Sequence, residues 1–162
     1  MAMSSLRAPA ARDSAGVDAA LLILRVVLGL LILLHGVSKL PPPPEFLASA
    51  LSERGLPAFV AYGVYLGEIV GPILIIVGIW TRVGAVLIVA NMVVAVLVAH
   101  AGDLLHLNKQ GGYALELQAM YLFVAVALAF TGAGRLSVAA DGRPPQMRPG
   151  DTVVYLVPAA QT

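Results

Sequence analysis

The sequence predicts an all-α integral membrane protein, an antiparallel four-helix bundle with a short interfacial amphipathic helix between its first and second transmembrane helices. Four nearly uncharged runs each match the ~20 residues that a helix needs to cross a hydrocarbon core of ~30 Å. They are residues 19–38, 58–80, 83–101 and 113–132. Hydrophobic residues make up 59% of the 162 residues and charged residues only 12%, against roughly 45–50% and 25% in soluble domains. A soluble domain of this length could not bury so much apolar surface.

A single membrane domain over residues 19–137 accounts for most of the chain. The amino-terminal tail, 1–18, is rich in Ala and Ser, so we expect it to be mobile and cytoplasmic. Asp18 is the expected N-cap of the first helix. The first run is long, contains Arg25 and lacks a small-residue cleavage pattern, which favours a retained helix over a cleaved signal peptide. Residues 138–162 form a second cytoplasmic tail, polar and rich in proline.

The connections between the runs predict how the helices meet. The first helix should end near Lys39, because the four prolines that follow, 41–44, cannot continue it. Residues 45–54 alternate apolar and polar sides at helical spacing, which predicts the amphipathic helix in the interface. Only Thr81 and Arg82 separate the second and third runs, so these helices should form a tight antiparallel hairpin.

Basic residues predict the orientation in the membrane. The two tails and the turn between the second and third runs hold Arg7, Arg12, Arg82, Arg135, Arg143 and Arg148. The opposite loops hold Lys39, Arg54 and Lys109. Because basic loops stay in the cytoplasm, both termini are expected there.

Three polar residues inside the runs are predicted to have structural roles. Counting ~1.5 Å per residue places Arg25 about 10 Å into the first helix and Glu68 near mid-membrane on the second. A charge exposed to lipid is costly, so we predict an ion pair between Arg25 and Glu68, with Glu116 as the alternative partner of Arg25. Asn91 lies nine residues before His100, half a turn away around the helix, so it is expected to hydrogen-bond to a different neighbour from His100.

Four other polar residues converge near the outer leaflet from three helices. They are His35, Lys39, His100 and Glu116. A few hydrogen-bonding groups beside apolar walls suit a quinone headgroup, so this cluster is our candidate quinone and proton site. The alternative interpretation is that these groups only meet lipid headgroups or cap helix ends. No catalytic residue is assigned, and the absence of an HxxxH pair or similar ligand spacing disfavours haem and metal.

Small residues on two helices predict close packing. Gly63, Gly67 and Gly71 recur at every fourth residue of the second run, the spacing at which helices approach closely in membranes. Gly29 and Gly36 of the first run are the expected counterparts. Pro72 follows the ridge and removes the N–H that the Glu68 carbonyl would otherwise accept.

Charge and cysteine content exclude several functions. The net charge of +1 argues against nucleic-acid binding. The chain has no cysteine, which excludes thiolate nucleophiles, iron–sulfur ligation by the chain and a dithiol relay of its own. Any redox chemistry must therefore use a bound cofactor or another subunit.

The order and spacing of several motifs resemble the DoxX family of membrane proteins. The motifs are RVVLG at 25–29, HGVSKL at 35–40, GLP at 55–57, Glu68 with Gly71, GIWTR at 78–82, Glu116 with Tyr121, and GAGRLS at 132–137. The resemblance implies a four-helix, multi-pass protein of the bacterial cytoplasmic membrane. It also implies that Arg25, His35, Glu68, His100 and Glu116 occupy recurrent polar positions. Related members are assigned as the small membrane subunit of thiosulfate:quinone oxidoreductase, or as partners of a sulfurtransferase and a superoxide dismutase.

From these features we expect a membrane-anchor and quinone-facing subunit of an oxidoreductase complex. Its partners would be the lipid bilayer, soluble redox-enzyme subunits and further copies of the chain. Two other functions stay open at this point. One is a non-enzymatic scaffold, assembly factor or cargo-handling protein, and the other is an oligomeric small-molecule transporter.

Overall fold

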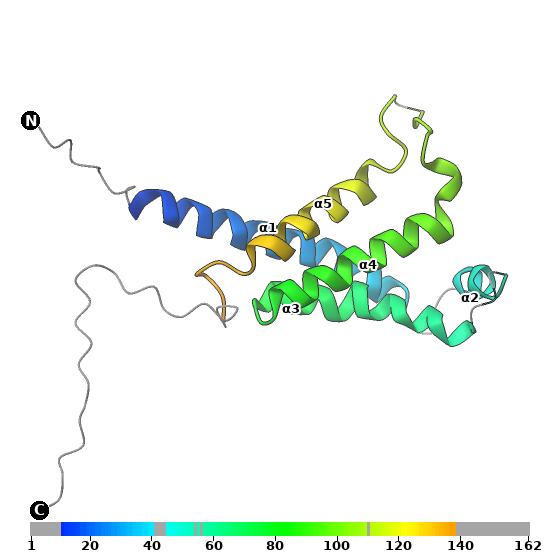
Figure 1. The fold of residues 1–162 in the computed structure, drawn as a ribbon, viewed down its shortest axis with the longest axis horizontal. Helices are drawn as coiled ribbons and strands as arrows, with labels where there is room; N and C mark the ends of the chain where they lie inside the picture. The colour runs from blue at the N-terminus through cyan, green and yellow to red at the C-terminus, as the bar shows by residue number, and fades with distance from the viewer. Residues whose placement is uncertain (1–10, 41–44, 54, 56, 110, 139–162) are drawn as a thin grey trace, which may run out of the picture.

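A computed structural model describes residues 11–40, 45–53, 55, 57–109 and 111–138, and the elements over these residues are helical. This confirms the all-α prediction (Figure 1). The elements are α1 (Ala11–Ser38), α2 (Glu45–Ser52), η1 (Ala58–Gly63), η2 (Leu66–Val70), α3 (Gly71–Val77), α4 (Thr81–Ala99), η3 (Ala101–Asp103) and α5 (Glu116–Thr131). The four prolines and most of both predicted tails lie outside the described residues.

Three helical segments in the described part of the chain are long and apolar enough to cross a membrane. They are Ala15–Ser38, Phe59–Val77 and Thr81–Ala99. α5 is also apolar, but its 16 residues make it shorter than the expected helix over 113–132. Tyr113 remains in the loop, where it forms a bridge with Leu107 and donates its hydroxyl hydrogen to the Leu104 carbonyl.

The first helix starts earlier than the sequence predicted. α1 begins at Ala11, so Asp18 lies inside the helix and its predicted role as N-cap is wrong. The Asp18 carboxylate instead accepts the backbone N–H of Arg135 at 2.9 Å. An acid that sits within a helix binds a distant segment here rather than its own helix end.

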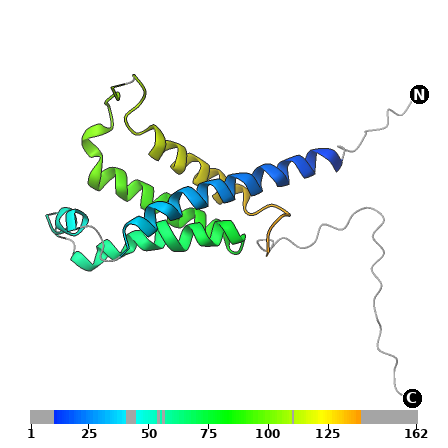
Figure 2. The ribbon, with the colours of Figure 1, turned by 180° about the vertical axis from the view of Figure 1, so that it is seen from behind.

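The helices pack around one apolar core. Leu28 and Ile32 of α1, Ile75 of α3, Ile88 of α4 and Leu128 of α5 are buried in it. Figures 1 and 2 show the start of α1, the α3–α4 turn and residues 132–138 at one end of the molecule. α2 and the loop between α4 and α5 lie at the other end.

The tight turn between α3 and α4 lies at residues 78–80, slightly before its predicted place at Thr81 and Arg82. α3 ends at Val77 and α4 begins at Thr81. Gly78 has φ +79°, and its N–H donates to the Leu74 carbonyl as a left-handed C-cap. Glycine therefore ends the helix where the apolar run alone indicated that it continues.

The glycines of α1 allow the second helical segment, Phe59–Val77, to approach closely, but, contrary to the expectation, they are not the counterparts of its glycine ridge. A Cβ added at Gly36 would lie 2.5 Å from the Glu68 carbonyl oxygen, and one added at Gly29 would lie 3.2 Å from the Pro72 carbonyl oxygen. α1 thus packs on residues of the second segment other than its glycines.

The expected glycine ridge of the second segment faces α4 instead. A Cβ at Gly71 would lie 2.9 Å from the Gly84 carbonyl oxygen, and a Cβ at Gly67 would overlap the side chain of Asn91. Nothing lies within 4 Å of a Cβ added at Gly63. Two members of the ridge therefore set the distance to α4, and the third does not pack on a helix.

A π-helical turn precedes Pro72. Over Leu66–Val70 the helix widens, and the Gly71 N–H donates to the Leu66 carbonyl, five residues back. Because proline has no N–H, the regular bond from residue 72 to the Glu68 carbonyl is also absent. π-turns occur frequently at functional sites, and this one contains Glu68.

Candidate functional site: a cavity beside the Lys39–Glu68 ion pair

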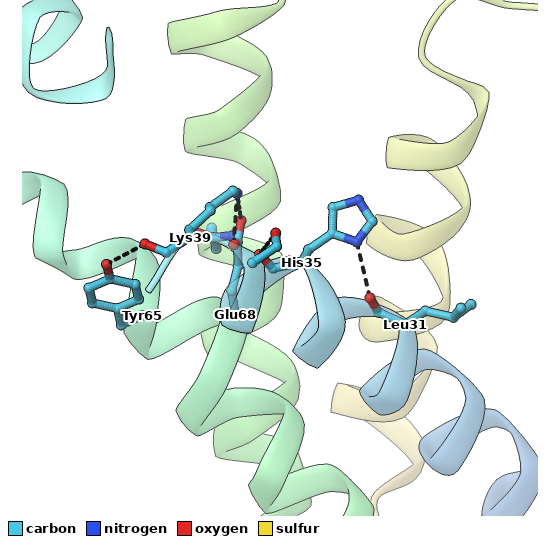
Figure 3. A network of polar contacts seen from close by, with 7 residues as sticks. Leu31, His35, Lys39, Tyr65 and Glu68 are labelled. Atoms are coloured by element: carbon cyan, nitrogen blue, oxygen red, sulfur yellow. Dashed lines mark hydrogen bonds and ion pairs between the residues drawn. The ribbon is translucent and has the colours of Figure 1, made fainter. Parts of the chain in front are cut away.

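Lys39 and Glu68 form a close ion pair in the half of the molecule that contains α2. The Lys39 ammonium nitrogen lies 2.6 Å from Oε1 and 2.7 Å from Oε2 of Glu68 (Figure 3). The Glu68 side chain is 5% exposed and that of Lys39 29% exposed. A charge as deeply buried as this carboxylate is stable only with such a partner.

Two further groups hold this pair in place. Asn91 of α4 donates its side-chain N–H to Glu68 Oε1 at 3.3 Å. The Tyr65 hydroxyl donates to the backbone carbonyl of Lys39 at 2.8 Å, which fixes the end of α1. The carboxylate on η2 is thus bonded by side chains from α1's end and from α4 at once.

The predicted ion pair between Arg25 and Glu68 is wrong, and Arg25 lies at the opposite end of the bundle. Its buried guanidinium donates to the Leu136 carbonyl and lies beside Gly78. The reason is the offset of the helices along their axes. Glu68 is level with Gly36, which follows Arg25 by 11 residues, or about 16 Å of helix. The Arg25 side chain also points back toward the start of α1.

A cavity of about 330 Å³ opens beside the ion pair, between α2, η1, η2 and α4. Its polar lining side chains are Lys39, Glu68, Asn91 and His100. The walls are otherwise apolar or small, and they include Leu47 and Leu51 of α2, Val60 and Val64, and Leu87, Val94, Ala95 and Val98 of α4. His100 follows Asn91 by nine residues, so it lies about 14 Å further along α4.

His100 also has a partner outside the cavity. It caps the carboxyl end of α4, and its Nδ1 lies 3.3 Å from Oδ2 of Asp103. Both side chains are partly exposed, at 37% and 52%. The cavity therefore has an ion pair and an amide at one end and an imidazole with a carboxylate neighbour at the other.

His35 and Glu116 do not join the other two members of the predicted cluster. His35 points away from the Lys39–Glu68 pair, and its Nδ1 lies 3.1 Å from the Leu31 carbonyl oxygen (Figure 3). Its ring packs edge to face with the ring of Tyr121, with the two centroids 6.3 Å apart. Glu116 opens α5 and is exposed. Neither residue lines the cavity.

The structure thus brings Lys39 and His100 together with Glu68 and Asn91, two residues predicted to be only structural. The sequence signal that could have indicated Glu68 is Pro72, which follows it by four residues and lies just beyond the π-turn that contains Glu68. Among the described residues, no group of three or more His, Asp or Glu side chains could hold a metal ion. The polar side chains and apolar walls of the cavity can offer a ligand hydrogen bonds and apolar contact.

Comparison with known proteins gives one family. Residues 20–101 match the DoxX family. An "Uncharacterized protein" of Haemophilus influenzae is 32% identical over 117 residues, which cover 70% of this chain and 84% of that one. A Bacillus subtilis protein named "Putative oxidoreductase CatD" is 30% identical over 101 residues, covering 62% of this chain and 75% of that one. No solved structure shows a significant match.

Proposed function

The chain belongs to the DoxX family, and from this premise we propose that it is a quinone-binding membrane subunit of an oxidoreductase complex. The observation that supports this proposal best is the apolar cavity with the Lys39–Glu68 pair and Asn91 at one end. Its volume of about 330 Å³ lies within the range of small-molecule sites, roughly 300–1,000 Å³.

The proposed setting is the bacterial cytoplasmic membrane. In this proposal α1, the segment Phe59–Val77, α4 and α5 form an antiparallel four-helix bundle with both termini in the cytoplasm. The packing of Gly71 on Gly84 and of Gly67 on Asn91 supports the antiparallel hairpin, because the residue numbers rise on one helix as they fall on the other. The basic-residue count supports the orientation. α2 lies in the outer interface and covers the cavity.

The chemistry of the cavity favours a neutral ligand with a carbonyl group. Lys39 and Glu68 neutralise each other, so an anionic headgroup would meet the Glu68 carboxylate as well as the ammonium. The Lys39 ammonium has a third N–H, and the Asn91 amide has a second one, so both can still donate. A quinone carbonyl accepts such bonds, and the apolar walls along α4 suit its tail.

Electrons would have to come from a partner subunit. The chain has no cysteine, so it has no thiol chemistry or iron–sulfur ligation of its own. The name of the Bacillus subtilis relative supports an association with redox chemistry. A non-enzymatic scaffold would need the helices and α2, but it would not need a cavity lined by the hydrogen-bond donors of Lys39 and Asn91.

Blocking the cavity without touching its polar groups tests the proposal. The full chain in nanodiscs is titrated with decylubiquinone, and bound quinone is measured after separation. Ala95→Phe fills the cavity wall, and Ala127→Phe on an exposed part of α5 is the matched control. We expect Ala95→Phe to lower the affinity about tenfold or more, with Ala127→Phe unchanged. Equal affinity for both variants would refute the site.

A further inference from the structure

The second polar end of the cavity has the geometry of a proton-exchange group. His100 lines the cavity, and its Nδ1 faces the Asp103 carboxylate at 3.3 Å. A carboxylate oxygen accepts a hydrogen bond from a ring N–H, so this contact favours the tautomer with the hydrogen on Nδ1. The other ring nitrogen, Nε2, is then the group that can meet a ligand: it accepts a hydrogen bond in the neutral ring and donates one when the ring is an imidazolium.

Among the described residues, Asp103 is the charged side chain that contacts His100, and the charged groups nearby are paired elsewhere or exposed. Lys39 and Glu68, the charged groups that line the cavity, are paired with each other. On α2, which packs on α4, the charged residue is Glu45, and it is exposed, as is Glu53 just beyond the helix. His106 in the following loop is also exposed.

We propose that His100 is a catalytic residue that exchanges a proton with one quinone oxygen, and that Asp103 is its positioning residue. The proposal rests on the quinone site proposed above. Lys39 and Asn91 hold one oxygen of the ring, and His100 Nε2 meets the oxygen on the opposite side. This assigns para-quinones as the ligand class, since their two oxygens point in opposite directions.

Reduction of the quinone to the quinol takes two electrons and two protons. A two-electron donor on a partner subunit, a dithiol or a reduced flavin, supplies the electrons and is oxidised. The Nε2–H bond of the His100 imidazolium breaks as the O–H bond forms on one oxygen, which leaves a neutral imidazole. The second proton reaches the other oxygen from the Lys39 ammonium, which regains a proton from water as it gives one and so stays paired with Glu68. Each group takes a proton back from water, and the two side chains are 29% and 37% exposed on the surface of the chain.

Nitrogen NMR of the three histidines tests this proposal directly. The full chain, labelled with ¹⁵N-histidine, is placed in nanodiscs and titrated with decylubiquinone. We expect the ring signals of His100 to shift with ligand, with His35 and His106 as internal controls, since neither lines the cavity. His100→Leu assigns the signals and should lower the affinity roughly three- to tenfold, the loss of one hydrogen bond.

Asp103→Asn tests the positioning role through the tautomer of the His100 ring, which would not change if Asp103 had only a structural role. We expect the ligand-free His100 signals to change from one tautomer to a mixture, with the helices intact by circular dichroism. Lys109→Gln, a substitution in the exposed loop, should change neither the His100 ring signals nor the circular dichroism. An unchanged tautomer in Asp103→Asn would refute the role of Asp103.

The two proposals fail in different ways. If decylubiquinone binds and Ala95→Phe blocks it while the His100 signals stay still, the proton-exchange role is refuted and the quinone site remains. If decylubiquinone does not bind the chain at all, both proposals are refuted.

Discussion

Removal of Lys39 should destabilise the protein much more than its partial exposure suggests. Lys39→Met leaves the Glu68 carboxylate, 5% exposed, with Asn91 as its remaining hydrogen-bond partner. Breaking a buried ion pair on one side costs about 3–5 kcal/mol. Glu68→Leu leaves an ammonium that is 29% exposed instead of a buried charge, so it should cost only about 1–2 kcal/mol. The double substitution removes both charges and should come close to wild type.

The free energy of unfolding in mixed micelles is measured by titration with SDS and followed by far-ultraviolet circular dichroism. Lys109→Met, in an exposed loop, is the control for loss of a lysine. The order of stability should be wild type, then the double variant, then Glu68→Leu, then Lys39→Met. A Lys39→Met protein as stable as the control, or a double variant no better than Lys39→Met, would refute the reasoning.

Two further substitutions test the packing and the far end of the bundle. Gly36→Ala places a Cβ 2.5 Å from the Glu68 carbonyl oxygen, so it should separate the helices and lower stability by about 1–3 kcal/mol; Gly63→Ala, with nothing within 4 Å, should be tolerated. Arg25→Leu removes the donor to the Leu136 carbonyl, so limited proteolysis should cleave residues 132–138 faster, and an unchanged cleavage rate would contradict this role.

The helices could be predicted from the sequence because the length of an apolar run is a local property. Their contacts could not, because contacts depend on how far one helix is displaced along another. The end of α1 is level with the middle of the second segment, where Gly36 packs on the Glu68 carbonyl. Depth counted along each run separately therefore did not show which residues are level, and Lys39 rather than Arg25 became the partner of Glu68.

His35 and Lys39 show a second limit of helical spacing. They are four residues apart, which predicts side chains on one face. α1 ends at Ser38, so Lys39 no longer follows the helical phase. Its side chain turns to Glu68, while His35 packs on Tyr121. The polar residues at the ends of runs could be identified from the sequence, but the sides that they face could not.

Photoaffinity labelling tests the central claim, that the cavity between α2, the second segment and α4 binds a quinone. The full chain in nanodiscs is irradiated with an azido-quinone, with and without excess decylubiquinone, and the labelled peptides are identified by mass spectrometry. We predict labels within residues 60–68 and 87–100 that the competitor abolishes. Labels confined to α5, or labels in the cavity that the competitor leaves unchanged, would contradict the claim.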